Sequence, residues 1–141
     1  MILFCDTSAL LKLYIDEEGS SSMVDLAARC SLLAVARIAW VEAHAALSRR
    51  VREKPTDQGG IDLARNRLAR QWPDYLTIEL TPHLAERAAS LADLFALRAY
   101  DSVQLASAEF DSRALGEPVN FACFDRRLAR AGEALGLAAN A

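Results

Sequence analysis

An apolar run leads directly into a carboxylate and two hydroxyls in the sequence MILFCDTS, residues 1–8. The run has the length of a short buried strand, and residues 9–14 have the apolar spacing of an amphipathic helix. In α/β proteins, ligands are bound at the carboxyl ends of strands, which is where Asp6 lies. Asp6 is therefore a candidate functional residue. Aspartate is also a common helix N-cap, so a purely structural role stays open.

Strand-like and helix-like segments alternate along the rest of the chain. The predicted strands are residues 2–5, 32–36, 76–80 and 119–124. The predicted helices are residues 8–15, 21–29, 38–54, 61–71, 82–97, 102–113 and 126–135. Such alternation predicts an α/β fold in which helices cover both faces of a parallel sheet. With 141 residues, of which 52% are hydrophobic, we expect a single domain over residues 1–141 with a sizeable core.

The composition also bears on location. No apolar stretch approaches the roughly 20 residues that span a membrane, so we expect a soluble protein of the cytoplasm without membrane association. The three cysteines show neither CxxC nor Cys/His metal spacing, as is typical of thiols in a reducing cytosol.

Charge is unevenly distributed although the net charge is only −3. Residues 49–70 contain seven basic side chains against three acidic ones, whereas the first 25 residues are mainly acidic. One interpretation is a basic helical arm beside an acidic pocket that binds a polyanion through divalent metal. The other is an ordinary solvated helix face.

Three more acids join Asp6 as candidates. Glu42 lies beside apolar neighbours on a predicted helix, Asp101 opens a predicted helix, and Asp125 directly follows a predicted strand. Parallel strands bring Asp6 and Asp125 to the same sheet edge, where like charges repel unless a cation joins them. Oxygen ligands favour Mg²⁺ or Mn²⁺ over zinc. The hydroxyls of Thr7 and Ser8 are suited to hold metal-bound water.

Four segments carry a family resemblance. They are Leu3-Phe4-Cys5-Asp6-Thr7-Ser8-Ala9-Leu10, Trp40-Val41-Glu42-Ala43, Arg98-Ala99-Tyr100-Asp101-Ser102-Val103-Gln104-Leu105-Ala106 and Phe124-Asp125-Arg126-Arg127-Leu128. Their order resembles the acidic motifs of PIN-domain metal-dependent ribonucleases, specifically VapC-like toxins of toxin–antitoxin pairs. The resemblance covers essentially the whole chain and implies the PIN-like three-layer α/β/α fold with four to five parallel strands.

The resemblance also implies a site and partners. Asp6, Glu42, Asp101 and Asp125 would form the catalytic metal site for Mg²⁺ or Mn²⁺, with Thr7 or Ser8 in support. The substrate would be RNA, hydrolysed by an endoribonuclease that acts as a toxin and is bound by a cognate antitoxin. A helical hairpin over residues 38–71 would serve homodimerisation and antitoxin binding. Cys123 departs from the family pattern, since many relatives carry Thr or Ser there.

Other functions fit the sequence less well or remain open. A phosphatase with Asp6 as nucleophile would need a second Asp where Ser8 stands. No GxSxG, P-loop or GxGxxG occurs. A non-catalytic PIN-like module that binds a protein partner stays open, with the acids in structural roles. For the nuclease we also expect phosphate contacts from Arg126 and Arg127, whose alternative is plain surface charge.

Overall fold

The computed structural model describes the backbone of residues 1–140 and the side chains of residues 1–138. One sheet forms from five strands, and every neighbouring pair is parallel. The strands are β1 (Ile2–Cys5), β2 (Leu32–Ala36), β3 (Leu76–Ile78), β4 (Val119–Ala122) and β5 (Ala138–Asn140). Their order is β3-β2-β1-β4-β5, which places β1 at the centre. The predicted parallel sheet of four to five strands is confirmed.

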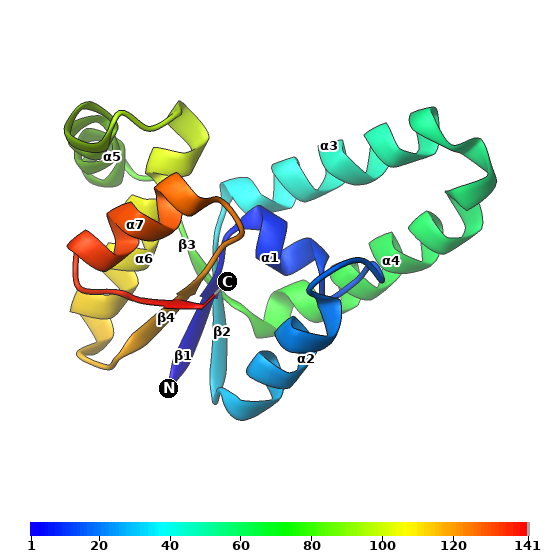
Figure 1. The fold of residues 1–141 in the computed structure, drawn as a ribbon, viewed down its shortest axis with the longest axis horizontal. Helices are drawn as coiled ribbons and strands as arrows, with labels where there is room; N and C mark the ends of the chain where they lie inside the picture. The colour runs from blue at the N-terminus through cyan, green and yellow to red at the C-terminus, as the bar shows by residue number, and fades with distance from the viewer. Residues whose placement is uncertain (141) are drawn as a thin grey trace.

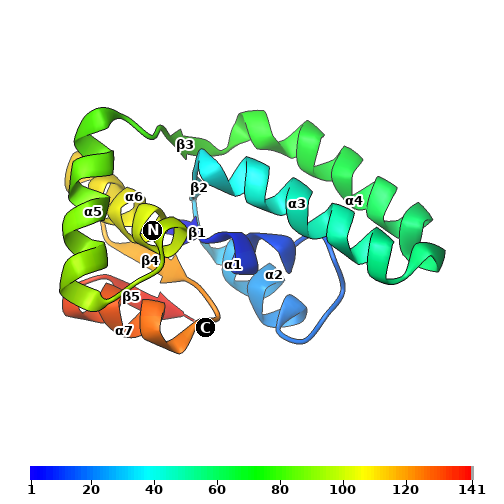
Figure 2. The same cartoon turned by 90° about the horizontal axis from the view of Figure 1, so that it is seen from above.

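Helices connect these strands and cover both faces of the sheet (Figures 1 and 2). They are α1 (Thr7–Leu11), α2 (Ser20–Arg29), α3 (Ile38–Glu53), α4 (Gln58–Gln71), α5 (Pro82–Phe95), α6 (Ala99–Leu115) and α7 (Arg126–Ala134), with short 3-10 turns at Pro55–Asp57 and Trp72–Asp74. Within residues 1–140, none of the helices has both the length and the apolar character needed to cross a membrane.

The period-two alternation of the strands divides the core between two layers. Phe4 and Phe121 are fully buried on the face that packs against α5, α6 and α7. Leu3 and Val35 are fully buried on the opposite face, against α1, α2, α3 and α4. The molecule is thus a three-layer α/β/α structure, as the sequence predicts.

Helix α7 approaches the sheet closely because it carries a glycine at the contact. A Cβ built on Gly132 would lie 2.8 Å from Cδ2 of Phe121, closer than real Cβ contacts. Glycine therefore lets the last turn of the helix lie against the Phe121 ring of β4.

Helices α3 and α4 form the predicted hairpin, which projects as an arm to one side of the sheet in Figure 1. Leu47 of α3 and Leu68 of α4 are both fully buried in the layer that also includes α1 and α2. The arm is thus packed onto the body along its inner side.

Several predicted boundaries are wrong, and two of them concern the candidate site. Helix α6 begins at Ala99, so Asp101 lies in its first turn, and the N-cap position belongs to Arg98. Strand β4 ends at Ala122, so Cys123 and the bend at Phe124 lie between the strand and Asp125. Helix α1 ends at Leu11, four residues before the predicted end, and β3 ends at Ile78.

Candidate active site

All the parallel strands end at one edge of the sheet, and the predicted acids gather there. Asp6 follows β1, Asp125 follows β4, and Glu42 lies in the early part of α3, which follows β2. Asp101 comes from the start of α6. A cavity of about 330 Å³ is lined by Asp6, Thr7, Ser8, Glu42, Arg98, Asp101, Gln104, Phe124 and Asp125. The structure thus brings together the four predicted carboxylates and both predicted hydroxyls.

Asp6 is both a helix cap and part of the cavity wall. Its Oδ1 accepts hydrogen bonds from the backbone N of Ala9 at 2.9 Å and from Oγ of Ser8 at 2.7 Å. The residue is 6% exposed. Burial raises the pKa of Asp6 to about 6, while the two hydrogen bonds lower it and the nearby charges of Asp101 and Glu42 raise it further.

Ser8 links the two loops that carry aspartates. Its hydroxyl donates to Asp6 and also accepts a hydrogen bond from the backbone N of Phe124, at 3.3 Å. Since Phe124 precedes Asp125, this contact ties the end of β1 to the loop after β4. Asp125 in turn caps α7, because its Oδ1 accepts from the backbone N of Leu128 at 3.0 Å.

Glu42 is held by two neighbours. Its Oε1 accepts from Oγ1 of Thr7 at 2.8 Å and from Nε2 of Gln104 at 2.9 Å, and Nε2 of Gln104 also lies 3.1 Å from Oγ1 of Thr7. This triangle joins α1, α3 and α6 at the cavity. Gln104 is 2% exposed, and its Oε1 is buried without a hydrogen-bond partner in the described part of the chain.

Asp101 differs from the other acids because its side chain accepts no hydrogen bond within the described residues. Burial raises the pKa of Asp101, and the charges of Asp125 and Glu42 raise it further, whereas Arg98 lowers it. Arg98 is the cation that lines the cavity, so four carboxylates face one guanidinium there.

The donors fit a hard divalent cation by their chemistry. In residues 1–138, hydrogen bonds occupy only one oxygen of Asp6, Glu42 and Asp125 and none of Asp101. The buried Oε1 of Gln104 adds an acceptor with no partner. Oxygen ligands of this kind suit Mg²⁺ or Mn²⁺. However, in the described residues no three His, Cys, Asp or Glu side chains already form a group that could hold a metal ion.

Three lining residues, Arg98, Gln104 and Phe124, have no role in the sequence interpretation. Gln104 lies three residues after Asp101 on α6, so helical spacing places it on the same face, and that spacing is the available signal. Cys123 behaves differently, since it is buried and its thiol lies 3.6 Å from the backbone O of Asp125. It does not line the cavity.

Ion pairs engage four of the seven basic side chains in residues 49–70. Arg49 pairs with Glu53, Arg65 with Asp62, and Lys54 with Asp57. Arg50 pairs with Glu17, one of the acids in the first 25 residues. Arg52, Arg67 and Arg70 form no ion pair within the described residues. The two interpretations of residues 49–70, an arm that binds a polyanion and an ordinary solvated helix face, both stay predictions.

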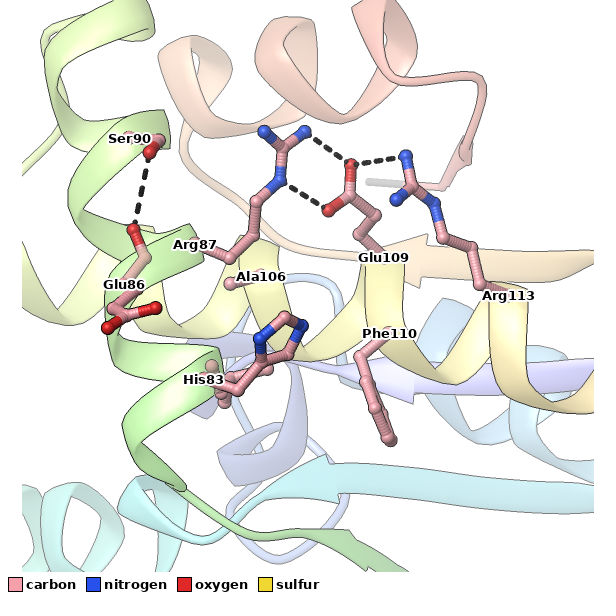
Figure 3. Close-up of a pocket in the computed structure, with 9 residues that line it drawn as sticks. His83, Glu86, Arg87, Ser90, Ala106, Glu109, Phe110 and Arg113 are labelled. Carbon is pink, nitrogen blue, oxygen red and sulfur yellow. Dashed lines mark hydrogen bonds and ion pairs between the residues drawn. The ribbon is translucent and has the colours of Figure 1, made fainter.

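A separate cavity of about 410 Å³ lies between α5 and α6 (Figure 3). Its wall contains a charged bridge in which Glu109 accepts two hydrogen bonds from Arg87, at 2.7 and 2.8 Å, and one from Arg113 at 3.4 Å. The hydrogen bonds from Arg87 lower the pKa of Glu109. None of the four acids lines this cavity, whose charges serve to join the two helices.

The fold and the cavity define a class, namely a three-layer α/β/α protein with a carboxylate centre at the carboxyl edge of a parallel sheet. The family model of the PIN domain matches residues 3–134. Ribonuclease VapC45 of Mycobacterium tuberculosis (strain CDC 1551 / Oshkosh) is 35% identical over 143 residues, which cover 96% of this chain and 92% of that protein. The chain belongs to the PIN-domain family.

Solved structures share this fold. The crystal structure of Mycobacterium tuberculosis VapC20, a sarcin-ricin loop cleaving toxin, superposes with a TM-score of 0.68 at 20% identity, covering 92% of this chain and 95% of that one. A toxin–antitoxin complex from Klebsiella pneumoniae gives a TM-score of 0.53 at 21% identity, covering 85% and 84%. At these identities the likeness shows the fold.

Proposed function

We propose that this PIN-domain protein is an endoribonuclease that hydrolyses RNA phosphodiester bonds with Mg²⁺ or Mn²⁺ at the four-acid cavity. The observation that carries the proposal is the convergence of Asp6, Glu42, Asp101 and Asp125 from four separate elements into one cavity. A purely structural role would not require four acids in one cavity with a single cation. The ribonuclease relative, similar over nearly the whole chain, supports the same activity.

The four carboxylates would hold the metal through the oxygens that have no hydrogen bond. When bound, a divalent cation lowers the pKa of a water and offsets negative charge on phosphate oxygens. Gln104 and Thr7 position Glu42 by fixing its Oε1, and Ser8 does the same for Oδ1 of Asp6. These side chains therefore set the orientation of the acids before any substrate is present.

The test uses Asp101, because its carboxylate makes no hydrogen bond that folding would lose. We expect Asp101→Asn to lower metal-dependent RNA cleavage by at least about 100-fold, since the removed oxygen charge no longer holds the metal. Cleavage is measured with Mn²⁺ on total cellular RNA, and folding by thermal melting.

Asp93→Asn is the matched control, since Asp93 is an exposed aspartate on α5 outside the cavity. Parental activity in Asp93→Asn and loss in Asp101→Asn supports the proposal. Undiminished cleavage in folded Asp101→Asn contradicts it, and leaves the non-catalytic binding module as the alternative.

We further propose that the protein acts in the cytoplasm as the toxin of a toxin–antitoxin pair and forms a homodimer. Its free cysteines fit a reducing compartment. The fold shared with a toxin–antitoxin complex supports the antitoxin partner. The α3–α4 arm is the proposed contact for both, and its exposed apolar side chains include Leu63, 59% exposed, and Val41, 63% exposed.

A further inference from the structure

The acid cavity does not end at the four carboxylates. Arg98, Asp101 and Asp125 also line a second hollow of about 280 Å³. That second hollow shares Arg127 with a third one of about 400 Å³. The three hollows therefore follow one another along the side of the molecule where α6 begins and α7 lies.

The charge changes sign along this path. The first hollow has four acids and one arginine, whereas the third is lined by Arg126, Arg127 and Arg130, together with Phe95 and Ala131, and by no acid. All three arginines are exposed. Within the described residues none of them forms an ion pair, in contrast to Arg49, Arg65 and others of the arm.

The position of these arginines is unfavourable for the helix itself. Arg126 and Arg130 are one turn apart on α7, and like charges at that spacing destabilise a helix. Arg126 and Arg127 also open the helix, where positive charge opposes the helix dipole. In α2, α3, α4 and α6 basic residues lie in the last turn, where they are favourable, although Arg37 and Arg98 stand at the N-caps of α3 and α6. Arg126, Arg127 and Arg130 are thus expected to lower the stability of α7.

One hydrogen bond holds α7 next to the segment that joins α5 and α6. Nη1 of Arg127 donates to the backbone O of Ala96 at 3.3 Å, which joins the start of α7 to the segment between α5 and α6. Ala96 adopts a left-handed conformation, with φ of 53°, at the end of α5. Arg127 is thereby fixed between the second and third hollows, and its other guanidinium nitrogens stay available.

We propose that Arg126, Arg127 and Arg130 form a phosphate-binding track that holds the RNA strand to one side of the scissile bond. The proposal rests on the ribonuclease function, because continuity with the acid cavity is what selects RNA over another polyanion. The acids repel a phosphate chain, and the track supplies the compensating attraction. Such contacts are independent of base sequence and sensitive to salt.

The test measures binding of a short fluorescein-labelled oligouridylate by anisotropy, with chelator present so that metal does not contribute. We expect the double variant Arg126→Gln, Arg130→Gln to bind about tenfold more weakly at low salt. The slope of log affinity against log salt should fall by roughly 1.4, about 0.7 for each lost single-strand contact.

The matched control removes the same charge elsewhere. Arg29 and Arg113 are exposed, lie in the last turns of α2 and α6 outside residues 49–70, and line none of the three hollows. Arg29→Gln with Arg113→Gln should keep the parental affinity within about twofold and the parental salt slope. Arg126→Lys with Arg130→Lys should restore the slope, because it restores the charge. Thermal melting confirms that each variant is folded.

The outcomes separate the track from the ribonuclease function. If the Gln double variant keeps the parental affinity and slope, or the parent does not bind oligouridylate, the track is overturned. The ribonuclease function is judged independently, by metal-dependent cleavage in the parent and its loss in Asp101→Asn. A parent that cleaves RNA and a Gln double variant that binds like the parent would overturn the track alone.

Discussion

At the scale of single residues, the acids of the cavity combine capping with exposure of oxygen atoms. Asp6 and Asp125 both cap helices, as the structural interpretation predicted for Asp6. Capping occupies Oδ1 alone, so the same side chain can close a helix and still present an oxygen to the cavity. The two interpretations of these aspartates are therefore compatible.

Gln104 shows what the sequence could not provide. Its place near Asp101 is implied by helical spacing, but its bonds to Thr7 and Glu42 join residues 97 and 62 positions apart in the chain. Such contacts depend on how α1, α3 and α6 meet at the sheet edge. The local periodicity of the sequence does not determine how these three helices pack together.

A second buried carboxylate, Asp111 of α6, gives a prediction about stability. Asp111 is 1% exposed, and neither of its oxygens has a hydrogen-bond partner in the described residues. Burial raises the pKa of Asp111 to about 6. The folded protein therefore binds this proton more tightly than the unfolded chain, so stability should fall as pH rises from about 4 to about 6.

Asp111→Asn removes this titration. We expect the parent to lose about 2 kcal/mol more unfolding free energy between pH 4 and pH 7 than the variant does. Urea unfolding at both pH values measures the difference, and Asp93→Asn should follow the parent because Asp93 is exposed. Equal losses in the parent and in Asp111→Asn would contradict the assignment.

At the scale of elements, the strands with the clearest apolar runs are predicted as observed. Ile2–Cys5 and Leu32–Ala36 have the same bounds in sequence and structure. Strand β5 was not located, since Ala138–Asn140 is short and consists of residues that are depleted in strands. The start of α6 was placed too late, because Arg98 at the N-cap makes no side-chain cap bond that would mark it.

The α3–α4 arm is the element with a proposed role in assembly. Leu63 on α4 is 59% exposed, which leaves apolar surface uncovered in the single chain. If the arm forms the homodimer, Leu63→Glu should shift the protein towards the monomer mass in light scattering, because a buried carboxylate has no partner there. Leu94→Glu, on α5 and 67% exposed in the single chain, is the control that should retain the parental mass.

An unchanged mass in Leu63→Glu, with a dimeric parent, would exclude this part of the arm as the contact. A monomeric parent would contradict the homodimer itself. In either case the acid cavity lies at the sheet edge and is formed entirely by residues of one chain, so the nuclease proposal does not depend on the result.

At the scale of the whole molecule, the topology determines where the chemistry lies. Because every strand pair is parallel, all the strand ends open at the same edge, and α1, α3 and α7 begin there. The family and the three-layer fold are confirmed by the comparisons and the structure. The roles of the four acids remain predictions, because they concern a metal and a substrate rather than the fold.

The central claim is that the four acids form a metal site. It is tested most directly by calorimetric titration of Mn²⁺ into chelator-stripped protein, with folded Asp101→Asn and Asp93→Asn alongside. The account predicts saturable binding in the parent and in Asp93→Asn, and binding at least about tenfold weaker in Asp101→Asn. Because the pKa of Asp6 is about 6, affinity should also decrease as pH falls through 6 and the carboxyl gains a proton. No binding in the parent, or equal binding in Asp101→Asn, would contradict the account.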